Sequence, residues 1–468
     1  MDPEKRARRQ NVRLIVSEAV MVVAVVAMVV VLGFLVSGYW LSSDFKVERQ
    51  GMLQISSVPT GATVAVDGEA PWYQRTNTSK VLSTGEHTIS LTKDGYDSWS
   101  RTVNIREGLL YRVNYPRLFL LEREKEAVYN DSELATTLAT VSPDHKWMLL
   151  INNTTTWQLI NLSNEKIEPK KISVARLFDA VSLADGATTG LFTGKIVSAN
   201  WSGDNDHILI QSQADGVVEW VVLNVRNIAE SVNITREFAT SFDGVRIFDN
   251  SASVLLVMKG GNLHKIDVSA RQISAVLVEK VQSYNVFGSE IIFTASKESL
   301  YYTGIIKIND PTEVNIIVSP SEKSVKAYIS RFYDEKYITI IDKNAISVYK
   351  YDGMEVFFEG DLTFQACRVK VSADGGFVFM NDGGSIITLD MEALELREWT
   401  LESDGYGWLD GHTVYTVNGG VLTVYDFDGL NRREISKNVS ASFPITITDN
   451  KWLYYFSDGK LVREKITD

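Results

Sequence analysis

A repeat fills the chain from residue 117 to residue 468. Each unit consists of a strand, a turn with Asp, Asn or Gly, a strand, a second turn and a strand. The first turns recur at spacings of 36 to 60 residues, near Asp144, Asp204, Ser251, Gly288, Asp334, Asp374, Asp410 and Asp449. Short strands at this period are typical of a β-propeller, whose four-stranded blades take roughly 40 to 50 residues each. The pattern therefore predicts an all-β propeller of eight blades at 117–468.

Two features of the repeat leave choices open. The longest interval contains LFDAVSLADGATTGLF, which is either an insertion or a miscounted unit, so seven blades is the alternative. The apolar segment RLFLLER at 117–123 precedes the first repeat, and the last repeat ends at its third strand. We expect 117–123 to complete the last blade. The runs SPD at 142–144 and SAD at 372–374 resemble propeller repeats of the WD-like and TolB-like kind. Because a tight turn favours Asp, we interpret the recurrent aspartates as turn formers.

The N-terminal region predicts a single transmembrane helix at 14–40. Its centre, Ala19–Val36, has no polar side chain, and at 1.5 Å per residue such a helix covers about 27 Å of the roughly 30 Å hydrocarbon core. Five Lys or Arg side chains lie in the tail at 1–13, so the positive-inside rule places the N-terminus in the cytoplasm. A cleaved signal peptide is the rival interpretation, but this apolar run exceeds the usual 7 to 15 residues. We expect a single-pass cell-membrane protein whose bulk is extracytoplasmic.

A small β domain is predicted at 51–116, after a polar tether at 41–50. Its alternating segments LQISSV, ATVAV, HTISLT and WSRTVNI are separated by turns at Asp67-Gly68, Thr84-Gly85 and Asp94-Gly95. The run VPTGATVAVDG, followed by LSTGEHTISLTKDGYDSWSRTVNI, resembles the PEGA domain, with Thr60 in place of the family's Glu. The resemblance implies an extracytoplasmic protein of a bacterial envelope. Trp72 and Tyr73 lie where the sequence departs from the family pattern, on an expected exposed loop.

The composition and the absence of known motifs argue against several classes of function. The net charge is −12, which argues against nucleic acid as a partner. Cys367 is the only cysteine, so no intrachain disulfide forms. The sequence has no nucleophile elbow, zinc-binding His-Glu-x-x-His motif or phosphate-binding loop, and we predict no catalytic residue, metal or cofactor.

These features favour a non-enzymatic, membrane-anchored binding or scaffold protein of the bacterial cell envelope. Its expected partners are the lipid bilayer, through one helix, and an envelope protein or cell-wall glycan. The candidate contact residues are aromatic, because rings near turns can grip a protein or sugar: Trp72, Tyr73, Trp201, Tyr406 and Trp408. Packing between blades is the alternative role for the last three. The alternative function is a propeller-type polysaccharide-cleaving enzyme, a glycosidase or lyase, which needs a carboxylate pair.

Overall fold

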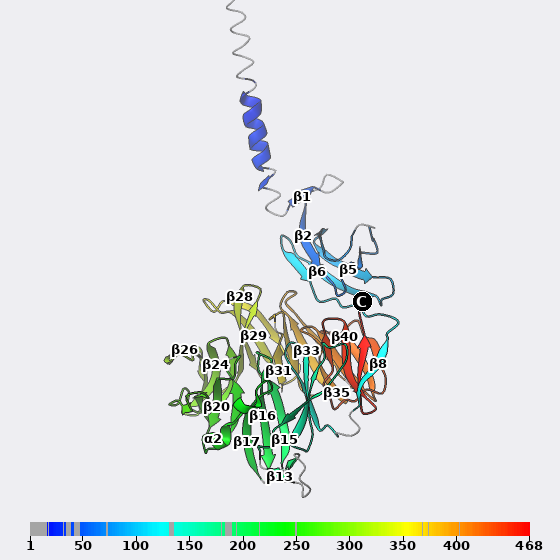
Figure 1. Ribbon diagram of the computed structural model, residues 1–468. Coiled ribbons are helices and arrows are strands. Elements are labelled where there is room, and N and C mark those ends of the chain that lie inside the picture. Colours follow the sequence, from blue (N-terminus) through cyan, green and yellow to red (C-terminus); the bar gives the residue numbers. More distant parts are fainter. Residues whose placement is uncertain are drawn as a thin grey trace, which may run out of the picture. The chain divides into compact units, whose positions relative to one another are not determined.

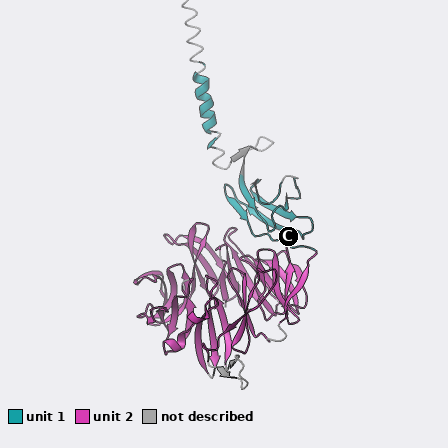
Figure 2. Cartoon of the chain, in the orientation of Figure 1, with its two compact units in different colours: residues 1–121 teal, residues 122–468 magenta. Residues whose placement is uncertain are grey.

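The structure is a computed structural model, and it describes residues 16, 18–30, 32–33, 39–41, 47–71, 74–130, 135–178, 180–182, 190–192, 194–214, 216–248, 250–366, 368–372, 374–401 and 403–468. The chain divides into two compact units, Met1–Leu121 and Glu122–Asp468 (Figure 2). The described residues near the N-terminus that are helical are 16, 18–30 and 32–33. No helix in the described part of the chain has both the length and the apolarity that a membrane span needs.

Unit 1 contains two small sheets. One joins β1 (Tyr39–Leu41), β2 (Val47–Ile55), β4 (Thr78–Ser83) and β7 (Leu110–Val113), with β7 parallel to β2. The other joins β3 (Thr63–Val66), β5 (Gly85–Thr92) and β6 (Trp99–Ile105). Side chains alternate along β3, so Val64 and Val66 share a buried face. Gly61 and Gly68 both have positive φ, which explains glycine at these two turns.

The prediction that 117–123 completes the last blade is wrong. Leu118 and Phe119 are buried in unit 1, where the backbone N–H of Leu118 donates to the carbonyl oxygen of Val58. Leu121 likewise donates to Gly95. The apolar run therefore covers the end of the small domain, and the propeller begins just after it.

His87 connects two parts of unit 1. Its Nδ1 lies 2.7 Å from Oδ2 of Asp67, and its Nε2 lies 2.9 Å from the backbone oxygen of Ser83. Both ring nitrogens thus lie within hydrogen-bond distance of an oxygen atom. The hydrogen bond to His87 lowers the pKa of Asp67, and the Thr88 backbone N–H adds to this effect.

The described part of unit 2 contains eight sheets of four antiparallel strands, and the four whose first strands come earliest in the chain are called blades 1 to 4 (Figure 1). Blade 1 has β9 (Leu138–Val141), β10 (Trp147–Ile151), β11 (Thr156–Asn161) and β12 (Lys170–Ser173). Blade 2 has β15 (Lys195–Trp201), β16 (His207–Ala214), β17 (Val217–Asn224) and β18 (Val232–Asn233). Blade 3 has β19 (Gly244–Ile247), β20 (Val254–Lys259), β21 (Asn262–Asp267) and β22 (Gln272–Ile273). Blade 4 has β23 (Val281–Phe287), β24 (Glu290–Lys297), β25 (Leu300–Lys307) and β26 (Asp310–Ser321).

Four more such sheets, blades 5 to 8, complete the unit. Blade 5 has β27 (Lys326–Phe332), β28 (Glu335–Asp342), β29 (Ala345–Lys350) and β30 (Val356–Asp361). Blade 6 has β31 (Arg368–Val371), β32 (Phe377–Asn381), β33 (Ser385–Asp390) and β34 (Glu395–Thr400). Blade 7 has β35 (Gly405–Trp408), β36 (Thr413–Asn418), β37 (Val421–Asp426) and β38 (Arg433–Ser436). Blade 8 has β39 (Thr446–Thr448), β40 (Trp452–Ser457), β41 (Lys460–Lys465) and, from the start of the unit, β8 (Lys125–Asn130).

The described residues between blades 1 and 2, and those after β17, add short elements. β13 (Ala180–Ser182) and β14 (Gly190–Phe192) form a separate hairpin, so the long interval in the repeat is an insertion. A 3-10 turn, η1 (Ile228–Glu230), and the short helix α2 (Ile234–Glu237) flank β18.

The eight sheets form a closed ring. Buried apolar clusters fill the space between successive blades from blade 1 to blade 7. Tyr454 and Phe456 of blade 8 share another cluster with Met148 and Leu150 of blade 1. Blades 7 and 8 are joined by a 2.9 Å hydrogen bond between Ser436 and the Tyr455 hydroxyl. This ring is a β-propeller, and the prediction of eight blades is confirmed.

A buried carboxylate fixes the closing strand. The side chain of Glu464 in β41 has no exposed surface, and its Oε1 accepts a 2.7 Å hydrogen bond from Nε of Arg123. Its Oε2 lies 3.4 Å from Nζ of Lys125 and accepts a 2.7 Å bond from the Tyr455 hydroxyl. Arg123 also donates from Nη2 to the Ile435 oxygen of blade 7. The residues that lead into β8 are thereby attached to two blades.

We expect Arg123→Ala to lower the free energy of unfolding of the propeller by about 3 to 5 kcal/mol, because it removes a main partner of a buried charge. Denaturant unfolding of the full-length protein measures this. Arg271→Ala is the matched control, since Arg271 pairs with Glu237 at 2.9 Å from an exposed position and should contribute about 1 kcal/mol or less. Equal effects of the two substitutions would contradict the role given to Glu464.

The lowered pKa of Asp67 makes one contact in unit 1 dependent on pH. A carboxyl whose pKa is lowered by folding contributes stability above its unfolded pKa, and this stability is lost as pH falls through the folded value. We expect Asp67→Asn to weaken hydrogen-exchange protection of β5 at pH 6, with the gap to wild type closing towards pH 3. Asp94→Asn, at an exposed turn, is the control. A gap of the same size at both pH values would contradict this coupling.

Candidate functional site

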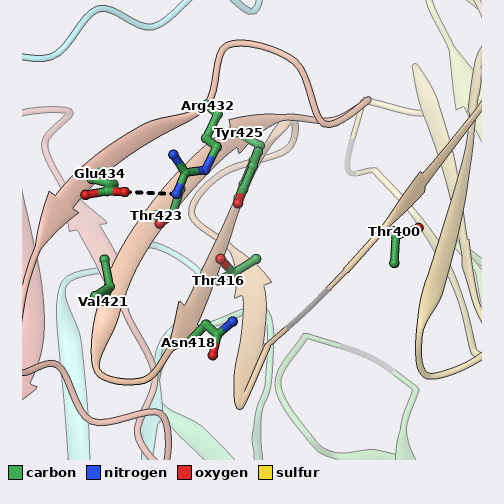
Figure 3. Close-up of a pocket in the computed structure, with 8 residues that line it drawn as sticks. All are labelled: Thr400, Thr416, Asn418, Val421, Thr423, Tyr425, Arg432 and Glu434. Carbon is green, nitrogen blue, oxygen red and sulfur yellow. Dashed lines mark hydrogen bonds and ion pairs between the residues drawn. The ribbon is translucent and has the colours of Figure 1, made fainter.

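A polar pocket of about 420 Å³ lies between blades 6 and 7 (Figure 3). Its described lining residues come from two neighbouring blades and are mostly hydroxyl-bearing or charged: Thr400, Thr416, Asn418, Val421, Thr423, Tyr425, Arg432 and Glu434. In Figure 3, Thr400 stands on a separate strand, across from the other seven side chains. A volume of this size is typical of small-molecule sites, roughly 300 to 1,000 Å³.

Strand pairing within blade 7 places the side chains of one pocket wall on the same face of the sheet. Thr416 of β36 pairs with Thr423 of β37, which pairs in turn with Glu434 of β38. These three side chains therefore form a row across one face of blade 7. Residues on the opposite face of β37, such as Leu422 and Val424, are fully buried. Most faces between blades are filled by aliphatic side chains, whereas threonines occupy this part.

The charged end of the pocket is an ion pair beside an aromatic ring. Nη2 of Arg432 donates to Oε1 of Glu434 at 2.9 Å. Hydrogen bonds to Glu434 and then Tyr425 raise the pKa of Arg432, so the guanidinium is cationic. The Tyr425 ring packs against Trp399 of blade 6, with 5.5 Å between the ring centroids. A guanidinium, a carboxylate, hydroxyls and a ring face together suit a polar, hydroxyl-rich ligand such as a sugar unit.

The recurrent aspartates hold turns, as predicted. Oδ1 of Asp144 accepts from the Ser142 hydroxyl at 2.5 Å and from the Lys146 backbone N–H at 3.1 Å. Asp374 repeats this geometry with Ser372. Oδ1 of Asp410 accepts from two backbone N–H groups of its own turn. The carboxylates at these turns therefore have structural partners.

His145 lies in the turn between β9 and β10. Nδ1 of His145 is 2.6 Å from the Thr446 hydroxyl, and the backbone oxygen of His145 accepts from Thr448 at 2.7 Å. These contacts join blade 1 to blade 8. Burial lowers the pKa of His145, while Asp410 and Asp144 act in the opposite direction.

Unit 1 contains the residue types of a hydrolytic triad, which sequence analysis missed. The Ser83 hydroxyl lies 3.3 Å from Nε2 of His87, whose Nδ1 faces Asp67. Nε2 is closer to the Ser83 backbone oxygen, at 2.9 Å, so it donates there and does not serve as the base for the hydroxyl. The arrangement is a structural contact that joins His87 of β5 to the residue after β3 and to the last residue of β4.

The aromatic residues predicted from the sequence do not gather at the pocket. Trp201 packs against the cluster between blades 1 and 2, and Tyr406 and Trp408 pack against the cluster between blades 6 and 7. Trp408 lies edge-on to Phe379, with 5.0 Å between centroids. Trp72, Tyr73 and Cys367 lie outside the described residues. Partner contact by the aromatic set stays a prediction.

Comparisons with solved structures return proteins that include β-propeller domains. The β-propeller domain of Myceliophteria thermophila Cps50 (Swd1) is 10% identical, with coverage of 74% of this chain and 100% of that chain and a TM-score of 0.40. The Dos1 propeller is 13% identical, with 74% and 94% covered and a TM-score of 0.42. An oligogalacturonate lyase in complex with manganese is 12% identical, with 57% and 88% covered and a TM-score of 0.38. At these values they carry no functional inference, and the propeller assignment stands on the ring of sheets.

Comparisons with protein families and curated proteins address the smaller unit. No curated protein matches the chain. Residues 50–117 match the family described as the PEGA domain, which agrees with the resemblance found in the sequence. The chain therefore contains a PEGA domain at 50–117, followed by an eight-bladed β-propeller.

Proposed function

We propose that this chain is a non-enzymatic binding or scaffold protein of the bacterial cell envelope, anchored in the membrane by its N-terminal segment. The propeller presents its surface to an envelope protein or a cell-wall glycan. The pocket between blades 6 and 7 is the observation that carries the binding role. It combines Arg432, Glu434 and Tyr425 with a row of threonines on a rigid ring.

The anchor rests on the sequence run Ala19–Val36 and on the exposure of its described side chains. Val20, Val23 and Val29 are each more than half exposed, at 63%, 68% and 63%. Exposed apolar surface of this extent favours burial against another apolar phase. Lipid is the phase that fits an uninterrupted apolar run after a basic tail.

Protease added to intact spheroplasts should degrade unit 2, because the bulk of the chain lies outside the cytoplasm in this proposal. The remaining N-terminal fragment should stay with the membrane after an alkaline carbonate wash. Full protection of unit 2, or release of the fragment by the wash, would contradict the predicted topology or anchor respectively.

Site-specific photo-crosslinking tests the binding role. A photoreactive amino acid at Asn418, which is exposed and lines the pocket, should capture one defined envelope protein or cell-wall glycan in living cells. The same amino acid at Lys166, on an exposed loop of blade 1, is the control and should not capture it. Arg432→Gln should reduce the yield at Asn418 severalfold.

The alternative function, a polysaccharide-cleaving enzyme, predicts glycan turnover in vitro. Turnover of a glycan by the purified protein, abolished by Glu434→Gln or another single acidic substitution, would overturn the non-enzymatic proposal. Glu434 is the only acid among the described pocket residues, whereas glycoside hydrolysis by the usual routes uses two carboxyl groups.

A further inference from the structure

The first strands of the eight blades have a charge composition unlike that of the whole chain. First strands of a propeller surround its central channel. Contacts between neighbouring first strands, such as β9 with β15 and β23 with β27, agree with this placement. The protein has a net charge of −12, yet these eight strands contain no Asp or Glu and six basic residues, Lys195, Arg246, Lys326, Arg331, Arg368 and Lys370.

Three of these basic side chains reach from one first strand to the next. Nη1 of Arg246 in blade 3 donates to the Tyr284 backbone oxygen of blade 4 at 3.2 Å, and its guanidinium lies 4.9 Å from the ring centroid. Arg368 of blade 6 approaches the Tyr406 hydroxyl of blade 7 at 3.5 Å. Lys370 lies 5.4 Å from the Trp408 ring centroid of blade 7. Contacts between successive first strands place these cations beside the axis.

The Lys370 side chain is accessible to solvent, but neighbouring protein groups partly desolvate its ammonium group. Lys370 belongs to the exposed residues of the chain, but burial lowers the pKa of its ammonium group. Both observations fit a side chain that projects into water within a concave surface. Among the described residues, no salt bridge joins a carboxylate to Arg246, Arg368 or Lys370. Neutral partners, a carbonyl, a hydroxyl and two rings, leave their positive charge uncompensated.

The aspartates closest to the first strands form hydrogen bonds with residues in turns. Asp144 and Asp410 lie at turns that follow first strands, and their carboxylates accept hydrogen bonds from their own turns. Burial lowers the pKa of His145, and the positive charge of Lys370 adds to this effect. Asp243 and Asp404, which precede first strands, accept hydrogen bonds from the backbone N–H groups of Gly261 and Gly419. The cations are therefore the charged groups along the first strands, and these aspartates lie in the turns before and after them.

We infer that the axial channel binds a multivalent oxyanion, a ligand that carries several phosphate or carboxylate groups. Arg246, Arg368 and Lys370 are its direct contacts, because each is a charged donor and guanidinium groups bind both oxyanions well. The basic residues are spread along the strands. Lys326 and Arg331, five residues apart in β27, are separated by about 17 Å at 3.3 Å per residue, so an extended ligand with repeated charges fits better than a single ion. This site is separate from the pocket between blades 6 and 7 and does not depend on it.

Calorimetric titration of the full-length protein with tripolyphosphate and with trigalacturonate tests the inference. We expect binding of at least one at low salt, with an affinity that falls as salt is raised. Binding of tripolyphosphate alone identifies phosphate groups as the ligand chemistry, and binding of trigalacturonate alone identifies carboxylates on a glycan. Binding of neither at low salt overturns the inference.

Substitutions locate the site. Arg368→Gln and Lys370→Gln should each weaken binding about tenfold, or about 1.4 kcal/mol, since each removes a charged donor to the ligand. Lys370→Arg, which keeps the charge, should bind within a few fold of wild type. Arg271→Gln and Lys166→Gln are matched controls at exposed positions away from the first strands. If the control substitutions weaken binding as much as the channel substitutions, the inference is wrong. Unchanged thermal unfolding of each variant establishes that the fold is intact.

Discussion

The propeller depends on one buried charge at the place where its ring closes. Glu464 has no contact with solvent, and Arg123, Lys125 and Tyr455 supply its partners. A desolvated carboxylate is tolerated only with such partners, so the residues before β8 and the last long strand must come together. Backbone pairing of β8 with β41 continues the same contact, with Lys125 opposite Glu464. The remaining blades then form a ring held by apolar clusters.

Much of this architecture could be predicted from local signals. The Ser-x-Asp turns recur because the same short geometry, in which a serine hydroxyl and a backbone N–H group donate to one carboxylate, follows the first strands of blades 1 and 6. The PEGA domain was recognisable for a similar reason, since Gly61 and Gly68 occupy positive-φ turns. The closing strand was assigned wrongly because an apolar run has the same pattern whichever sheet it joins. The pairing of Leu118 with Val58 is non-local and leaves no periodic signal.

The pocket and the axial cations were missed for a different reason. Thr416, Thr423 and Glu434 come from three strands, and only register places them in one row. Threonine is common in strands, so each residue alone is unremarkable. The charge bias of the first strands was present in the sequence, but it appears only when the repeats are aligned by strand. The sequence pattern favoured aromatic side chains as contact residues instead. Of these, Tyr406 and Trp408 lie in the packing between blades.

The origin of β8 also affects how the protein is made. Arg123 and Glu464 are 341 residues apart, so the ribosome must finish nearly the whole chain before they can meet. Until then β8, which is synthesised early, lacks the strand β41 with which it pairs in the eighth sheet, and the blades already synthesised form an open arc. Synthesis from the N-terminus allows unit 1 to fold early, while the propeller must wait for its last strands. Ring closure therefore requires a nearly complete chain, because a chain truncated before Glu464 lacks the carboxylate that binds Arg123 and Lys125.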